Sequence, residues 1–162
     1  RSGAFDFLFC VNALHHFASA HGFISEVSRV IRTGGALAVV GMDPCGRRSS
    51  WYGYHYFEGA YETDVQRFPS WAAVSNWFEA ERFEGVEFDV VERITDLHYG
   101  RGVFDDPFLA KSMCSQLILL TDDAYKAGLR RMEADIEEAE KRGQAIVFQS
   151  DLSIGMLVGY KT

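Results

Sequence analysis

Three polar residues that can do chemistry follow one apolar segment of the chain. Asn12, His15 and His16 come directly after residues 5–11, Phe-Asp-Phe-Leu-Phe-Cys-Val. A histidine can exchange a proton near neutral pH, and an asparagine amide both donates and accepts hydrogen bonds. His15 and His16 are therefore candidates for a general base or a substrate contact, with packing or the start of a helix as the alternative role. Because adjacent side chains point apart in such a segment and no third ligand is suitably spaced, we expect no metal site.

A second group of reactive side chains is a dense aromatic segment. Tyr52, Tyr54, His55 and Tyr56 fall within five consecutive residues, and Tyr61 follows closely. This density favours a cover over a bound substrate, and the alternative is a surface helix whose aromatic rings seal a sheet. The candidate catalytic residues are His15, His16, His55 and Tyr52.

The elements that must position these residues begin with a strand, a helix and a second strand. Residues 5–11 are almost continuously apolar, which is typical of a strand buried on both faces in a parallel sheet. Apolar residues from Phe23 to Ile31 recur with a helical period, with Ser19 as the predicted N-cap and Gly34-Gly35 as the stop. Residues 36–42 are a second apolar strand, so the pattern predicts a right-handed crossover between parallel strands.

The rest of the chain alternates helices and strands. Ser70 can cap a helix over 71–82, with Trp71 and Trp77 expected in the core, and Asp106-Pro107 can start a short helix. The further elements predicted are a strand over 86–98, a long amphipathic helix over 122–142, and strands over 145–149 and 152–160. The fold class is therefore α/β, with a parallel start and an antiparallel finish.

Ligands of open parallel sheets bind outside the carboxyl ends of the strands. Here those ends carry Asn12 and Asp43, which the crossover brings to the same edge. The aromatic residues 51–57 follow and can cover this edge, and His98 and Tyr99 are further candidates to line it.

Two stretches with their spacing carry a family resemblance. Phe5-Asp6 opens an apolar strand that ends in Asn12-Ala-Leu-His-His16, and Glu26-x-x-Arg-Val-Ile31 leads to Gly34-Gly35 and another apolar strand. This order resembles the second half of a class I S-adenosylmethionine-dependent methyltransferase of the small-molecule type. The departures from the family pattern are mild, at Ile31, Arg32 and Thr33. The match is close over about residues 5–42.

The resemblance implies a partial Rossmann-like sheet, closed by an antiparallel strand such as residues 153–160. It implies S-adenosylmethionine as cofactor and a small-molecule methyl acceptor as substrate. The residues that match cofactor-proximal positions of the family are Val11, Asn12, Ala13, Leu14 and His15. Residues 1–162 then form one domain, with 45–70 and 100–121 as cover or insertion segments.

The family's glycine-rich cofactor loop and ribose-binding acid have no counterpart in this sequence. Gly100-Arg-Gly102 is the one G-x-G spacing in the sequence, and Asp105 breaks the dinucleotide pattern. We therefore expect a C-terminal fragment that begins near the family's fourth strand and is inactive alone. Residues 5–11 would then be an uncovered apolar edge that pairs with a second copy, as a homodimer, or with the missing half. The alternative is a non-catalytic α/β interaction or dimerisation module derived from a methyltransferase.

Composition narrows the possible partners. The chain carries 16 Lys+Arg against 23 Asp+Glu, for a net charge of −7, and its local basic cluster is Arg47-Arg48. Because nucleic-acid binders need clustered positive charge, we expect no nucleic-acid partner. No apolar run reaches the roughly 18 residues of a membrane span, so we expect no membrane partner. Three widely spaced cysteines favour a reducing, cytoplasmic setting.

Overall fold

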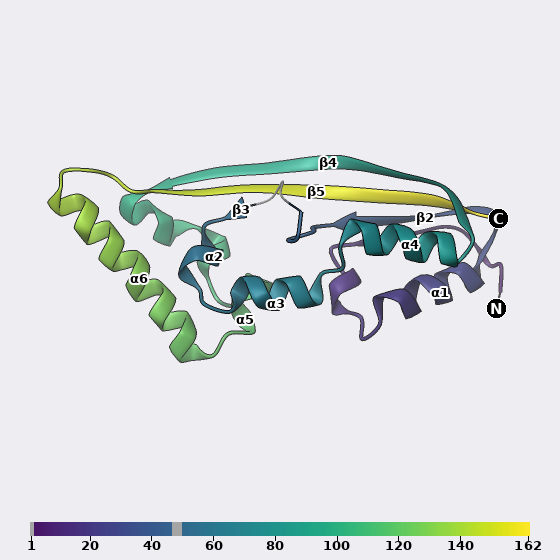
Figure 1. Ribbon diagram of the computed structural model, residues 1–162, viewed down its shortest axis with the longest axis horizontal. Helices are drawn as coiled ribbons and strands as arrows, with labels where there is room; N and C mark the ends of the chain where they lie inside the picture. The colour runs from purple at the N-terminus through teal and green to yellow at the C-terminus, as the bar shows by residue number, and fades with distance from the viewer. Residues whose placement is uncertain (1, 47–49) are drawn as a thin grey trace. The chain divides into compact units, whose positions relative to one another are not determined.

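The computed structural model describes residues 2–46 and 50–162, and Figure 1 shows the order of its helices and strands. The basic pair Arg47-Arg48 lies outside the described residues. The chain divides into two compact units, one formed by residues 1–46, 65–93 and 153–162 and the other by residues 47–64 and 94–152. Most of the predicted cover segments fall in the second unit, and the domain boundaries inferred from the sequence stay a prediction.

The first unit begins with the predicted strand, helix and strand. These are β1 (Phe5–Val11), α1 (Ala20–Val30) and β2 (Ile31–Gly41). β1 and β2 pair in parallel, as expected. The Ser19 hydroxyl accepts the Gly22 N–H at 2.9 Å, which confirms it as the cap that satisfies a free helix donor.

The end of α1 differs from the prediction. The helix ends at Val30, and Ile31 already pairs with Phe5 in the sheet. The pairing then jumps to Phe7 opposite Ala36, so the two glycines lie within an irregularity of the ladder and do not terminate the helix. Gly34 has φ of +77°, a backbone conformation that a glycine adopts without strain.

The sheet of the first unit closes with an antiparallel strand. β5 (Val147–Lys161) is one continuous strand, whereas two strands were predicted. Its residues 155–160 pair antiparallel with β2, which confirms the predicted closing strand and the α/β class, and β5 also pairs with β4 (Phe83–Tyr99). α4 (Trp71–Ala80) starts at the predicted cap, where the Ser70 hydroxyl accepts the Ala73 N–H. Figure 1 shows α1 and α4 side by side on the same side of β2.

The prediction that β1 is buried on both faces is wrong. Within the described residues β1 pairs with β2 alone. Its alternate side chains stay exposed on one face, at 49%, 52%, 67% and 50% for Phe5, Phe7, Phe9 and Val11. On the other face Cys10 is buried in the core with Ile24, Leu37 and Val39. One face of β1 is therefore an apolar surface with no cover among the described residues.

The second unit packs short helices and one long helix around an aromatic core. Trp51, Phe57, Met132, Ile136 and Phe148 are buried together there. The long helix, α6 (Asp122–Lys141), carries the predicted apolar stripe, and its N-cap Thr121 accepts the Ala124 N–H.

The remaining elements between β2 and β5 are short. They are β3 (Ser50–Trp51), α2 (Gly53–Tyr56), α3 (Ala60–Arg67), η2 (Gly100–Asp105), η3 (Pro107–Leu109) and α5 (Ser115–Ile118).

No helix in residues 2–46 or 50–162 combines the length and the apolar character that crossing a membrane requires.

Candidate functional site

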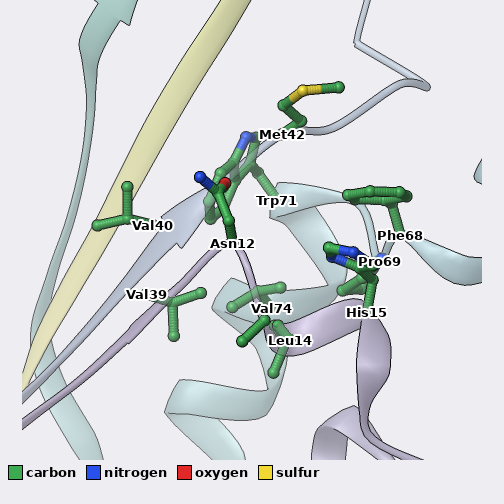
Figure 2. Close-up of a pocket in the computed structure, with 12 residues that line it drawn as sticks. Asn12, Leu14, His15, Val39, Val40, Met42, Phe68, Pro69, Trp71 and Val74 are labelled. Atoms are coloured by element: carbon green, nitrogen blue, oxygen red, sulfur yellow. The ribbon is translucent and has the colours of Figure 1, made fainter. Parts of the chain in front are cut away.

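A small pocket lies at the carboxyl ends of β1 and β2 in the first unit, where the parallel crossover predicted a ligand edge (Figure 2). The end of β1 and the turn after it supply Asn12, Ala13, Leu14 and His15. The end of β2 supplies one wall, and the chain leading into α4 supplies another. The remaining lining residues are Val39, Val40, Gly41, Met42, Phe68, Pro69, Trp71 and Val74.

Asn12 holds an unusual backbone conformation at the mouth of this pocket. Its φ is +47°, a region that asparagine tolerates better than most residues with a β-carbon. The Asn12 N–H donates to the Val40 carbonyl at 2.9 Å, so the turn is tied to β2 immediately after β1 ends. The amide side chain of Asn12 is drawn toward Trp71 in Figure 2. Asn12 thus brings a donor and an acceptor to an otherwise apolar pocket.

His15 is held as a neutral aromatic ring in the pocket wall. It lies in η1 (Leu14–His16) and stacks on Phe68 at a centroid distance of 3.9 Å. Burial, with the neighbouring His16 and Arg67, lowers the pKa of His15 from 6.5 to about 4. A group with so low a pKa is uncharged at neutral pH and is a weak base.

The two adjacent histidines do not point apart, contrary to expectation. The ring centroids of His15 and His16 are 4.0 Å apart. Their tight 3₁₀ turn buries Leu14, leaves His15 half-buried and leaves His16 exposed. No group of three metal-ligating side chains forms within the described parts of the chain.

The character of the pocket limits what it can hold. None of its lining residues is an acid, a lysine or an arginine, and its volume of ≈ 20 Å³ is room for about one water. A space of this size holds about one methyl group, and the rest of a molecule as large as S-adenosylmethionine needs other residues. The pocket by itself is therefore too small to enclose a whole cofactor.

Four of the five predicted cofactor-binding residues line the pocket, and Val11 does not, because its side chain lies on the exposed face of β1. The sequence missed Phe68 and Pro69, and it assigned Trp71 to the core alone. Ser70 correctly located the start of α4, but no local signal shows that the residues before a helix face a distant strand end. The structure supplies that link through Asp43, whose Oδ2 accepts the Trp71 N–H at 3.0 Å.

The aromatic residues of the second unit follow a repeated pattern. Tyr52, Tyr54 and Tyr56 each donate their hydroxyl to a different aspartate, at 2.6, 2.8 and 2.9 Å respectively. The acceptors are Asp106, Asp64 and Asp135. Hydroxyl bonds to carboxylates are shorter and stronger than neutral ones. The density of tyrosines that suggested a substrate cover therefore contributes three internal hydrogen bonds.

These bonds constrain the chemistry of Tyr52 and His55. Burial and the hydrogen bond to Asp106 raise the pKa of Tyr52 far above its ordinary value, so the phenolate that a base requires is disfavoured. Burial and Asp135 raise the pKa of Tyr56 to about 12. His55 is exposed and meets Tyr56 edge to face at 4.9 Å. Tyr52 and His55 lie in the second unit and His15 and His16 in the first, and their catalytic roles stay predictions.

The first part of the chain is similar in sequence to a known protein family. Residues 1–39 match the family described as a methyltransferase domain, the stretch that carries most of the sequence motifs. This match confirms the predicted resemblance to the methyltransferases. No curated protein sequence matches the chain.

Two solved methyltransferase structures agree with the chain in fold. A proposed methyltransferase from an antibiotic biosynthesis pathway of Anabaena variabilis superimposes with a TM-score of 0.65 at 20% identity, over 98% of this chain and 67% of that one. A proposed methyltransferase of Bacillus halodurans gives 0.50 at 19% identity, over 99% and 72%. A Haemonchus contortus phosphoethanolamine N-methyltransferase, solved with S-adenosylhomocysteine, gives 0.49 at 11% identity, over 99% of this chain and 34% of that one. The chain thus spans between about one third and three quarters of these proteins.

Replacing Tyr52 by phenylalanine tests the aromatic cluster. Tyr52→Phe leaves the buried Asp106 carboxylate without its hydroxyl donor, so we expect the free energy of unfolding to fall by about 2 kcal/mol. Urea denaturation followed by circular dichroism measures this loss. Tyr61→Phe is the control, because Tyr61 is exposed, and it should change stability by less than about 0.5 kcal/mol. Equal losses in both variants would contradict the role of the Asp106 bond.

The lowered pKa of His15 predicts acid sensitivity. Between pH 6.5 and about 4 the unfolded chain binds a proton at this residue that the folded chain refuses, so stability falls as pH falls through that window. We expect a loss of roughly 2 kcal/mol, less than the full shift implies because the ring is only partly buried. His15→Phe keeps the ring stack and removes this part of the pH dependence in thermal or urea unfolding. The control His21→Phe should keep this pH dependence. If the free energy of unfolding of His15→Phe falls with pH as steeply as that of the wild type, His15 is not its source.

Proposed function

We propose that this chain, which has the fold of S-adenosylmethionine-dependent methyltransferases and matches their domain family over residues 1–39, is the C-terminal part of an enzyme that methylates a small molecule. The observation that carries the proposal is the pocket at the carboxyl ends of β1 and β2. Its residues include the motif positions Asn12 to His15. The cofactor is S-adenosylmethionine, and the proposed setting is cytoplasmic, where Cys10, Cys45 and Cys114 remain free thiols.

The chemistry needs positioning more than covalent help. S-adenosylmethionine supplies a methyl group on a positively charged sulfur, which a nucleophile displaces in line. Val39, Trp71 and Val74 give the pocket apolar walls. The Asn12 amide can accept and donate a hydrogen bond at its mouth, and alignment of this kind accounts for much of the rate of such transfers. The cofactor-proximal residues in this proposal are Val11, Asn12, Ala13, Leu14 and His15, and the catalytic candidates are His15, His16, His55 and Tyr52.

The small volume of the pocket supports weak cofactor binding by this chain alone. We therefore propose that residues 1–162 do not sustain methyl transfer by themselves and that the complete protein does. Isothermal titration of S-adenosylmethionine into residues 1–162 and into the complete protein compares the two affinities. Micromolar affinity of residues 1–162 would contradict the proposed division of the site.

Asn12→Gly tests the pocket in the complete protein. Glycine keeps the positive φ at this position but removes the amide, so folding should persist while the affinity for S-adenosylmethionine falls about tenfold, the equivalent of one lost hydrogen bond. Titration calorimetry measures the affinity, and thermal unfolding verifies the fold. The exposed Asn76→Ala is the control and should bind as the wild type does. An affinity unchanged in Asn12→Gly would exclude a cofactor contact by this side chain.

The exposed face of β1 supports the proposed pairing with a second copy or with the missing half of the domain. The same face favours the alternative function, a non-catalytic interaction module.

Phe7→Ser with Phe9→Ser removes two large apolar groups from the exposed face of β1, so self-association of residues 1–162 should weaken at least tenfold. Sedimentation velocity over a concentration series measures this, with Ile118→Ser, an exposed residue of the second unit, as control. A wild-type chain that remains monomeric at high concentration would count against self-pairing.

A further inference from the structure

Three aromatic side chains line the small pocket of the first unit, and no acid, lysine or arginine lines it with them. The three are His15, Phe68 and Trp71 (Figure 2). The face of an aromatic ring carries partial negative charge and attracts a cation within about 6 Å of its centre. A pocket that holds about one methyl group and is walled by aromatic rings therefore suits a methyl group on a positively charged atom.

Two of the three rings are already engaged with other groups. The rings of His15 and Phe68 stack at a centroid distance of 3.9 Å, and the Arg67 guanidinium lies 5.7 Å from the centre of the Phe68 ring. The pKa of His15, lowered to about 4, leaves this ring uncharged at neutral pH, so it does not repel a cation in the pocket. Trp71 is the third ring, and tryptophan binds cations best among the aromatic side chains.

The fold holds the Trp71 indole in place from three sides, all within the first unit. A β-carbon at Gly155 of β5 would lie 2.8 Å from Cε2 and Cζ2 of Trp71, closer than such contacts occur, so the missing side chain lets the indole lie against the strand. The Phe88 ring of β4 meets the Trp71 ring at a centroid distance of 5.2 Å.

Asp43, which follows β2, supplies the third contact. Its Oδ2 accepts the Trp71 N–H at 3.0 Å, and its Oδ1 accepts the Cys45 N–H at 2.9 Å, so both carboxylate oxygens are held. A ring whose position the fold already sets loses little conformational freedom when a ligand binds, and this preorganisation favours affinity.

We infer that the indole ring of Trp71 binds the methyl-bearing sulfonium of S-adenosylmethionine, and that this contact selects the charged cofactor over the neutral product S-adenosylhomocysteine. The inference rests on the proposed function and adds to it a binding residue and a selectivity. Methyl transfer leaves the sulfur neutral, and Trp71 then has no cation to attract. The same ring that holds the cofactor therefore favours release of the product.

The affinities of three related ligands for the complete protein test the role of Trp71. S-adenosylmethionine carries a positive sulfur, sinefungin carries a protonated amine at the corresponding place, and S-adenosylhomocysteine is neutral there. We expect Trp71→Leu to weaken binding of the two charged ligands about tenfold and that of S-adenosylhomocysteine less than about twofold. Trp71→Phe keeps a ring that attracts cations less strongly, so its loss should be about threefold and again confined to the charged ligands. Isothermal titration calorimetry measures all three affinities.

Trp77→Leu is the matched control. Trp77 lies on the same helix and is also half-buried, but it stacks on His21 outside the pocket. This variant should bind all three ligands as the wild type does. Thermal unfolding verifies the fold of each variant, and Trp71→Phe decides the question if Trp71→Leu does not fold.

The ratio of the affinities separates attraction of a charge from simple packing. An equal loss for all three ligands in the Trp71 variants would mean that the ring only fills space and would overturn the inference, as would three unchanged affinities. Failure of the wild-type complete protein to bind either S-adenosylmethionine or S-adenosylhomocysteine would instead contradict the proposed function.

Discussion

The parallel pairing of β1 with β2 is the constraint on which the candidate site depends. Because the two strands run in the same direction, the turns that follow them emerge at one edge of the sheet. The Asn12 N–H bonds the Val40 carbonyl at this edge, and Asp43 holds the first turn of α4 there. An apolar pocket with one amide forms where these three segments meet. The site is therefore a consequence of strand direction and two hydrogen bonds.

Buried carboxylates organise the second unit in a comparable way. A buried charge is costly unless it receives hydrogen bonds, and Asp106 and Asp64 each receive a tyrosine hydroxyl. These bonds hold the carboxylates in place and occupy the tyrosine hydroxyls. His98 lies beside the same Asp106 carboxylate, with its Nε2 3.5 Å from Oδ2.

The sequence predicted that β1 is buried on both faces, but the structure leaves one face of this strand uncovered. A run such as Phe-Leu-Phe-Cys-Val normally packs on both faces in a parallel sheet. Here Cys10 packs against the core, and Phe7 and Phe9 face outward. Alternate aromatic residues on an exposed strand are a surface that other chains can cover.

The sequence by itself determined the features that depend on short-range patterns. Ser19 and Ser70 identified two helix starts, and the order of apolar segments predicted the crossover. The family resemblance implied the closing antiparallel strand and most of the turn from Asn12 to His15. Tertiary structure decided what depends on distant partners. The irregular pairing around Gly34, the contribution of Phe68 and Trp71 to the pocket, and the contact of His98 with Asp106 all join residues whose local sequence is silent about the partner. Periodicity reports which side of an element is apolar, but only packing decides which element that side meets.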